Sequence, residues 1–142
     1  MFRVQVNRSS DGKFQKVSDM LDGYRDLYLH EMAAQLVLFS PVDTGTYITG
    51  HHVGLTAVTP TRSSEGKERN RAHSEFDQEA MNDLSTQIRQ LPEGANQVIF
   101  SNDALHWHKV EYEHGHAPYN KTAREHKRLA DKAAAEARAG NR

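Results

Sequence analysis

The sequence predicts an α+β fold: a small antiparallel sheet covered by a long N-terminal helix and a second helix, with an additional C-terminal helix. Apolar residues recur at helical spacing over residues 17–39 and 76–91. Alternating or β-branched stretches, which are typical of strands, lie at residues 2–6, 47–59 and 97–101. At 142 residues the chain is long enough for one packed core and short for two.

The first strand and the first helix have the clearest patterns. Phe2, Val4 and Val6 alternate with polar residues, as in a strand that buries one face. The helix is predicted from apolar residues every three or four positions, namely Val17, Met20, Leu21, Tyr24, Leu27, Tyr28, Met32, Leu36 and Phe39. Pro41 ends this helix, because proline has no N–H group and disfavours the α conformation at Ser40.

The strand predicted at residues 47–59 is rich in β-branched residues. Val53, Leu55 and Ala57 form one of its alternating faces. Gly50 weakens the strand and marks a bulge or a close approach of two backbone segments.

Residues 60–72 are polar and predict a loop. Ser74 and Asp77 resemble a capping box at the start of the second helix, which Pro92 ends. The segment 104–119 mixes aromatic residues with histidines, and its pattern fits a helix, a strand or an ordered loop.

The C-terminal tail is rich in strong helix formers over residues 122–139. Its apolar face is thin, so we expect it to pack on a neighbouring subunit or to project into solvent. The sequence therefore divides into an α+β domain at 1–120 and a C-terminal helical extension at 121–142. Cations and carboxylates interleave along the tail, which favours a solvated face with ion pairs.

Composition narrows the classes of function. The chain has no cysteine, which removes disulfides, thiolate metal sites and thiol nucleophiles. Its net charge of −1 argues against a dedicated nucleic-acid binder. No stretch resembles a signal peptide or a membrane span, so we expect a soluble protein that is synthesised in the cytoplasm and has no membrane partner.

The most informative stretch is the corner between the first helix and the following strand: Ser40, Pro41, Val42, Asp43, Thr44 and Gly45. Side chains of Asp43 and Thr44 can accept hydrogen bonds from nearby amides, and Gly45 permits a positive φ. The structural interpretation makes Asp43 a brace of this corner, and Asp43→Ala would then cost about 1 kcal/mol of stability.

Two chemical alternatives give the hypothesis of a small dimeric hydrolase that depends on aspartate or metal. Asp43-Thr44-Gly45 matches the triplet of aspartic proteases, whose two aspartates activate water across a dimer axis. The triplet normally follows an apolar strand, however, whereas here a helix and Pro41 precede it.

The histidines offer the other alternative. His106 and His108, His114 and His116, and the adjacent His51 and His52 form three clusters that could bind zinc, with a carboxylate from Glu111 or Glu113. Polar surface or intersubunit contact explains the same spacing, so we assign no metal, cofactor or catalytic residue.

With these residues in view, the chain resembles the neck or tail-completion proteins of tailed bacteriophages, a tail-component family with a Ser-Pro-Val-Asp-Thr-Gly corner after a long helix. All six corner residues are present at 40–45. The family's second block, a strand with an asparagine, then an aromatic residue and a Glu-aromatic-Gly pattern, is similar to residues 98–102, Trp107 and 110–115 here. Tyr47, Ile48 and Gly50 depart from the residues that usually follow the corner.

The resemblance implies a structural virion protein without enzymatic activity, synthesised in the host cytoplasm and placed in the neck or tail. Copies would form a ring, as a homo-oligomer, around the channel through which DNA passes without specific binding. The adjacent partners would be the head–tail connector and the tail terminator or tube proteins. A host-encoded or prophage-derived interaction domain of the same shape is a further alternative.

Candidate interface residues follow from the second block. Trp107 and Tyr112 are candidate anchors, since aromatic residues dominate such contacts, and core filling is their other explanation. Glu111 or Glu113 would supply the family's carboxylate, and Gly115 its glycine.

Overall fold

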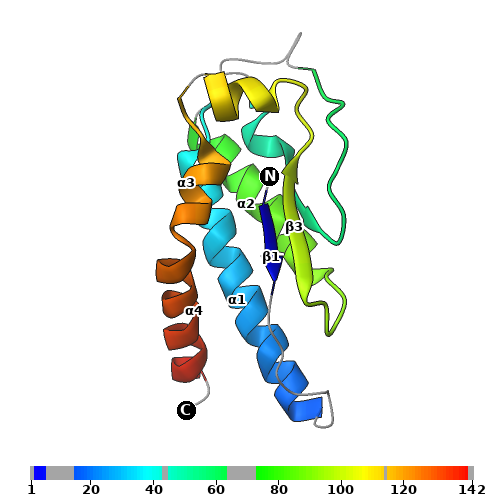
Figure 1. Cartoon of the computed structure of the whole chain (residues 1–142), viewed down its shortest axis with the longest axis vertical. Helices are drawn as coiled ribbons and strands as arrows, with labels where there is room; N and C mark the ends of the chain where they lie inside the picture. Colours follow the sequence, from blue (N-terminus) through cyan, green and yellow to red (C-terminus); the bar gives the residue numbers. More distant parts are fainter. Residues whose placement is uncertain (1, 6–14, 43–44, 64–72, 114, 141–142) are drawn as a thin grey trace.

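The computed structural model describes residues 2–5, 15–42, 45–63, 73–113 and 115–140. The helices and strands follow one another as β1 (Phe2–Gln5), α1 (Gln15–Phe39), a 3₁₀ turn η1 (Ile48–Gly50), β2 (His51–Gly54), α2 (His73–Arg89), β3 (Gln97–Asn102), a π-helical turn η2 (Lys109–Glu113), α3 (Pro118–Arg124) and α4 (His126–Gly140). This mixture of helices with a small antiparallel sheet confirms the predicted α+β class (Figure 1).

Helix α1 has the predicted length and ends at Phe39, directly before Ser40 and Pro41. Met32 and Leu36 of the predicted stripe are buried, whereas Leu27 and Tyr28 are half-buried and Leu29, which the stripe did not include, is fully buried. Arg25 is an exception to the pattern, because its side chain is only 2% exposed. One guanidinium nitrogen donates to the carbonyl oxygens of Pro92 at 3.0 Å and Ala95 at 3.1 Å, and thereby ties the start of α1 to the loop after α2.

The strands form one antiparallel sheet in the order β1–β3–β2. Phe2 lies opposite Phe100, and Val53 lies opposite the same Phe100 on the other side. Alternate residues therefore face the helices, with Val4, Val98, Phe100, His51 and Val53 buried on that face.

Helices α1 and α2 cover the inner face of the sheet, and in Figure 1 α2 lies behind the strands. Phe76, Ala80, Leu84 and Ile88 of α2 join the sheet residues and α1 in one core cluster, as their spacing predicts. The predicted capping box is wrong, because α2 begins at His73 and Ser74 already lies inside the helix.

The strand after the corner is shorter than the predicted 47–59 at both ends, because Ile48–Gly50 form the 3₁₀ turn η1 and the strand runs only from His51 to Gly54. Leu55 is 52% exposed and Ala57 is also exposed, so the prediction that both share the buried face of Val53 is wrong. The chain instead crosses towards the outer face of the sheet, where Val58 N–H donates to the Ser101 hydroxyl at 3.0 Å. It then forms a bridge between Arg62 and Ala104.

The C-terminal tail is helical as predicted, but it breaks at Glu125 into α3 and α4. Helix α4 lies along α1 of the same chain, with Leu129 and Ala133 buried in that contact (Figure 1). Lys132 adds an ion pair with Glu31 of α1, with 3.0 Å between nitrogen and oxygen. The expectation that the tail packs on a neighbouring subunit or projects into solvent is therefore wrong, because α4 packs on α1 of its own chain.

The two edges of the sheet differ. Gln87 of α2 accepts a hydrogen bond from the Val53 N–H at 2.8 Å and so covers part of the β2 edge. Within the described parts of the chain, the backbone of β1 hydrogen-bonds to β3 alone, which leaves its outer edge open. A helix that spans a bilayer needs about 20 mostly apolar residues, and no helix in the described part of the chain has such a stretch.

Candidate functional site

A buried polar network lies at the start of β2. Its central residue is His51, whose side chain is 1% exposed. Its Nε2 lies 2.8 Å from the Ser40 hydroxyl, and its Nδ1 lies 2.8 Å from the Tyr119 hydroxyl. Asn102 donates to the carbonyl oxygen of Tyr47 at 2.9 Å, and its amide nitrogen lies 3.1 Å from His51 Nδ1. The network thus joins the end of α1, β2, β3 and α3.

The direction of these hydrogen bonds fixes the tautomer of His51. The Ser40 hydroxyl donates to the carbonyl oxygen of Leu36 at 2.6 Å, so it must accept from His51 Nε2–H. Nδ1 is then unprotonated, and its one lone pair accepts from the Tyr119 hydroxyl at 2.8 Å, with the Asn102 amide nitrogen as a second, longer contact. A nucleophilic serine would require the opposite arrangement, with the hydroxyl donating to the imidazole.

Burial and the neighbouring His52 lower the pKa of His51 to about 3, with desolvation as the main cause. Burial also raises the pKa of Tyr119 well above its ordinary value. Both groups therefore stay neutral near pH 7, as buried groups without a counter-charge must. The network can hold elements together, and it offers no exposed group to a substrate.

His52 points to the other side of β2 and lies in an open, charged pocket of about 360 Å³. Its Nε2 lies 2.8 Å from one carboxylate oxygen of Asp103. Arg62 donates to the other oxygen of Asp103 at 2.6 Å and to the carbonyl oxygen of Thr46 at 2.7 Å. Thr49 and two carboxylates of α2, Glu79 and Asp83, complete the lining.

Gly50 separates the buried network from this charged pocket. A Cβ at this position would lie 2.6 Å from an Asp103 oxygen and 2.9 Å from both Arg62 and Asn102 side-chain atoms. A larger residue would force these side chains to shift. The predicted close backbone approach is the hydrogen bond of 2.9 Å from the Asp103 N–H to the Gly50 carbonyl oxygen.

The corner after α1 is built as part of this network. Ser40 is 3% exposed and makes the two hydrogen bonds already described. Gly45 has φ of 82°, and a Cβ there would collide with the ring of Phe76, so no other residue fits without rearrangement. Pro41 and Val42 are half-buried, with Val42 packed against the core, whereas Asp43 and Thr44 lie outside the described residues.

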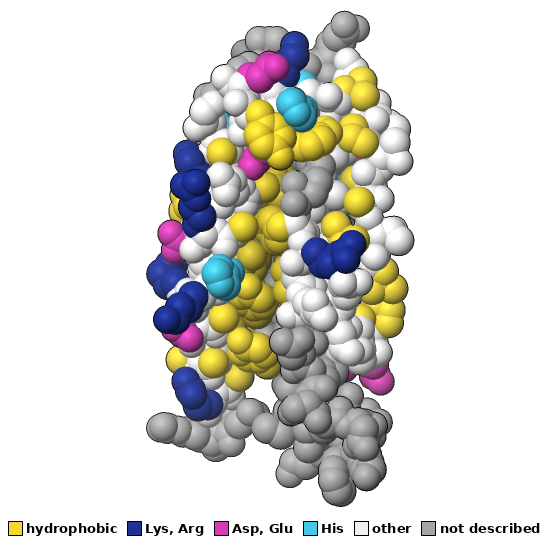
Figure 2. All heavy atoms as spheres, in the orientation of Figure 1, with side chains coloured by type: hydrophobic (Ala, Val, Ile, Leu, Met, Phe, Trp, Pro, Cys, Tyr) yellow, Lys and Arg dark blue, Asp and Glu magenta, His cyan; other side chains and the backbone are white. Residues whose placement is uncertain are grey.

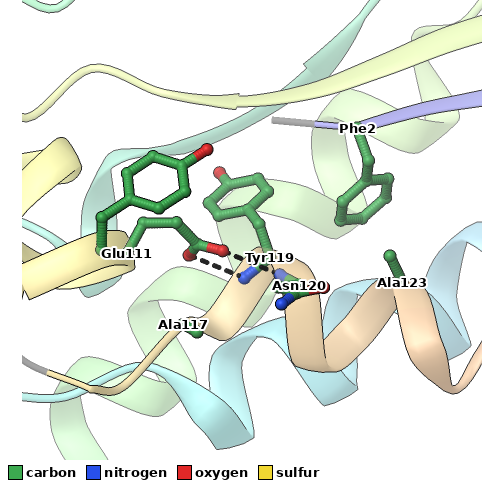
Figure 3. A pocket seen from close by; sticks show the side chains of 7 residues that line it. Phe2, Glu111, Ala117, Tyr119, Asn120 and Ala123 are labelled. Atoms are coloured by element: carbon green, nitrogen blue, oxygen red, sulfur yellow. Dashed lines mark hydrogen bonds between the residues drawn. The ribbon is translucent and has the colours of Figure 1, made fainter.

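Glu111 has an internal role. Its side chain is 5% exposed, and its two carboxylate oxygens accept the backbone N–H groups of Tyr119 at 3.0 Å and Asn120 at 2.8 Å (Figure 3). These amides belong to the first turn of α3, where a carboxylate is favourable. Glu111 therefore holds α3 in place and is not part of an exposed surface of the isolated chain.

A second pocket of about 360 Å³ lies beside this cap, between the start of β1 and helix α3. Phe2, Tyr119 and Ala123 form an apolar part, while Glu111 and Asn120 form a polar part (Figure 3).

An apolar furrow extends from this region. Figure 2 shows hydrophobic side chains gathered between the flank formed by α3 and α4 and the side of β1. Phe2 and Tyr28 pack partly buried against the core, and the Tyr24 hydroxyl donates to the Ala130 carbonyl at 3.4 Å. The furrow thus lies next to the open edge of β1.

The other predicted interface residues divide between core and surface. Trp107 is half-buried and packs against the core, which favours its core-filling explanation. Tyr112 is 65% exposed, and its ring lies 4.7 Å from that of His108. Glu113 and Gly115 are exposed, so their part in an interface remains a prediction.

The described histidines do not converge on a metal site. No group of three or more His, Asp or Glu side chains within those residues is arranged to hold a metal ion. Both ring nitrogens of His51 form hydrogen bonds within the buried network. His114 lies outside the described residues.

The comparisons with known proteins add no relative: no family model, curated protein or solved structure matches this chain.

Sequence analysis missed the roles of His51, Arg62 and Asp103. The only signal was the alternation of a strand, which places His51 and its neighbour His52 on opposite faces. Arg62 and Asp103 are 41 residues apart, and nothing in the local pattern of either indicates the pairing.

Proposed function

We propose that this chain is a structural virion protein of a tailed bacteriophage. Copies of it would form part of the neck, as a head–tail joining or tail-completion ring around the DNA channel. The ring would contact the connector on one side and the tail terminator or tube proteins on the other, without binding DNA specifically.

The observation that carries the proposal is the Ser-Pro-Val-Asp-Thr-Gly corner at the end of a long helix. In this chain Ser40 and Gly45 of that corner serve packing: Ser40 hydrogen-bonds within the core, and Gly45 lies against Phe76. The polar residues of the second block behave alike, since Asn102 and Glu111 both bond to backbone inside the chain. A ring subunit needs residues that keep its shape constant, and these residues have that role.

Features of the surface also support the proposal that copies of this protein assemble. Among the described residues, the outer edge of β1 has no strand partner, so its backbone groups can pair with another chain, and the apolar furrow lies beside it. Leu38, Leu105 and Tyr112 add large exposed apolar side chains, at 70%, 57% and 65% exposure respectively. Burial of such groups between subunits is the main source of stability in obligate assemblies.

The direct test is to stop production of the chain in a phage that encodes it. We expect filled heads and separate tails that fail to join, and normal particles after the gene is supplied from a plasmid. Infectious, complete particles formed without the chain would overturn the proposal. Immunogold electron microscopy should then find the chain at the joint, and not along the tail.

The hydrolase remains the second candidate only through Asp43, which lies outside the described residues. It is tested with purified protein by a protease assay and by metal analysis. Proteolysis that disappears in Asp43→Asn, with the thermal unfolding unchanged, would favour the hydrolase over the virion protein.

A further inference from the structure

Strand β1 lies at an edge that another strand can extend. Its backbone pairs with β3 on one side, from Phe2 opposite Phe100 to Gln5 opposite Gln97. Among the described residues, no strand pairs with its other side. Natural sheets protect such edges with proline, inward-pointing charges or a covering element, and the four residues of β1 include neither a proline nor an inward-pointing charge.

The two faces of β1 determine which side chains an added strand should carry. Side chains opposite each other in neighbouring strands lie on the same face of a sheet. Val4 is buried and Phe2 is half-buried on the face towards the helices, whereas Arg3 and Gln5 are exposed on the outer face. A strand beside β1 should therefore place apolar residues opposite Phe2 and Val4, and polar residues opposite Arg3 and Gln5.

Helix α3 bounds the far side of this space. The ring centroids of Phe2 and Tyr119 are 5.5 Å apart, and the pocket of about 360 Å³ lies between them and Ala123 (Figure 3). The apolar furrow continues from this pocket between β1 and the flank formed by α3 and α4 (Figure 2). A second folded sheet would run into α3, whereas a groove between a strand edge and a helix suits one extended segment.

The charge on both sides of the furrow favours an acidic segment. Arg3 is exposed on the β1 side, and helices α3 and α4 together carry six cations and three carboxylates. Two of these cations have carboxylate partners, since Arg128 pairs with Glu125 and Lys132 pairs with Glu31. The flank keeps an excess of positive charge, which Figure 2 shows as a column of lysines and arginines.

The pocket sets a different requirement at one position of the segment. Its carboxylate, Glu111, already accepts the N–H groups of Tyr119 and Asn120 and would repel a second carboxylate. Phe2, Tyr119 and Ala123 offer apolar contact beside it. The side chain that enters the pocket should therefore be large and apolar.

We propose that the furrow beside β1 binds an extended segment of another protein as a strand added to the sheet. Alternate apolar side chains of the segment face the furrow, and the acidic side chains between them face outwards near Arg3. Backbone pairing supplies the affinity in this mode of binding, and the alternate side chains supply the specificity. The inference deepens the proposed function, because the identification of the donor as a neighbouring virion protein rests on it.

The test uses a fluorescently labelled peptide of about nine residues as the probe. Glutamate alternates in it with valine, and phenylalanine takes the central apolar position. We expect saturable binding to the full chain in fluorescence anisotropy. A peptide of the same composition with its acidic and apolar residues in two blocks, and one with lysine in place of glutamate, should each bind about tenfold more weakly or less.

The first pair of variants tests the charge beside the added strand. Arg3→Glu should weaken binding of the glutamate peptide about fivefold or more and should strengthen binding of the lysine peptide. Arg89→Glu makes the same change of charge at the exposed end of α2, which lies behind the sheet in Figure 1, and should bind both peptides as the wild type does.

The second pair of variants tests the pocket. Ala123→Phe fills it and should weaken binding of the glutamate peptide about tenfold or more. Ala135→Phe adds the same ring on the exposed side of α4, opposite the buried Leu129 and Ala133, and should leave binding unchanged. Circular dichroism and thermal unfolding verify that each variant folds.

Hydrogen exchange distinguishes an added strand from a contact made by charge alone. The N–H groups of β1 that point away from β3 should exchange fast in the free protein and become protected when the peptide binds. Amides of α2 should exchange at the same rate with and without the peptide.

The inference is wrong if the glutamate peptide does not bind, if the block peptide binds equally well, or if exchange in β1 stays unchanged at saturation. Protection of the same amides in the concentrated protein alone would identify a second copy as the occupant and reject the acidic partner. The neck function is tested apart from this: heads and tails that fail to join without the chain would uphold it even without peptide binding. Peptide binding together with normal particles in the absence of the chain would keep the groove and reject the neck.

Discussion

His51 and His52 are adjacent in the chain, yet they belong to two regions with opposite properties. His51 is buried, neutral and bonded to Ser40, Tyr119 and Asn102, so every group it touches is part of the fold. His52 is 34% exposed and pairs with Asp103 in a charged, open pocket. One strand thus separates a region that determines stability from a region that is available for contact with another molecule.

The largest expected effect is the difference in unfolding free energy between alanine variants of the two histidines. His51→Ala removes a buried ring and leaves the polar groups of Ser40, Tyr119 and Asn102 without their partner, so we expect a loss of about 3 kcal/mol or more in unfolding free energy. His52→Ala should cost less than about 1 kcal/mol, because its ion pair is partly exposed. Urea denaturation of both variants measures the difference, and equal losses would contradict the division.

Acid should destabilise the protein through His51. Its pKa is about 3 in the folded state and near 6.5 in an unfolded chain, so the unfolded state binds more protons between these values. Stability contributed by the neutral ring is complete above pH 6.5 and falls by about 1.4 kcal/mol per pH unit below it. Unfolding free energies measured from pH 7 to pH 4 should show this slope in the wild type and in His52→Gln, and should lose it in His51→Gln.

Within the network, Ser40 should matter more than Tyr119. Ser40→Ala leaves the buried His51 Nε2–H without an acceptor, which costs about 2 kcal/mol. In Tyr119→Phe the imidazole Nδ1 still accepts from Asn102, so a loss of about 1 kcal/mol is expected. Chemical denaturation of the two single variants checks this order, and a larger loss in Tyr119→Phe would contradict the assigned tautomer.

Tyr47 provides the smallest effect and a control for Tyr119. Its hydroxyl is buried without a hydrogen-bond partner among the described residues, and burial raises its pKa. Tyr47→Phe removes a polar group that the fold does not use, so stability should stay within about 0.5 kcal/mol or increase. A loss as large as that of Tyr119→Phe, in the same thermal unfolding assay, would show that this hydroxyl has a partner.

The sequence was sufficient for the parts of the fold that depend on local pattern. The long helix with Met32 and Leu36 on its buried face and the apolar strand around Phe100 both have strong local patterns, and both are confirmed. The corner at Ser40 and Gly45 was also predictable, because proline and glycine act on the backbone next to them.

The remaining features depend on contacts between distant residues. Leu55 and Ala57 leave the sheet because Ser101 and Asp103 draw the following segment across its outer face. Arg25 is buried because two carbonyl groups about 70 positions further on accept its hydrogen bonds. No periodicity encodes such pairings, and the same is true of the packing of α4 on α1.

The candidate sites follow the same rule. Glu111 was singled out as a candidate interface residue, but the partners that the structure gives it, the amides of Tyr119 and Asn120, depend on where α3 begins. The interleaved cations and carboxylates of the C-terminal tail were visible in the sequence. The ion pair of Lys132 with Glu31, by contrast, required the packing of α4 on α1.

Electron cryomicroscopy of the neck of a phage that encodes this chain would decide the central claim. The account predicts a ring of copies at the head–tail joint. Particles whose neck lacks the chain, or a tail that carries it along its whole length, would contradict it.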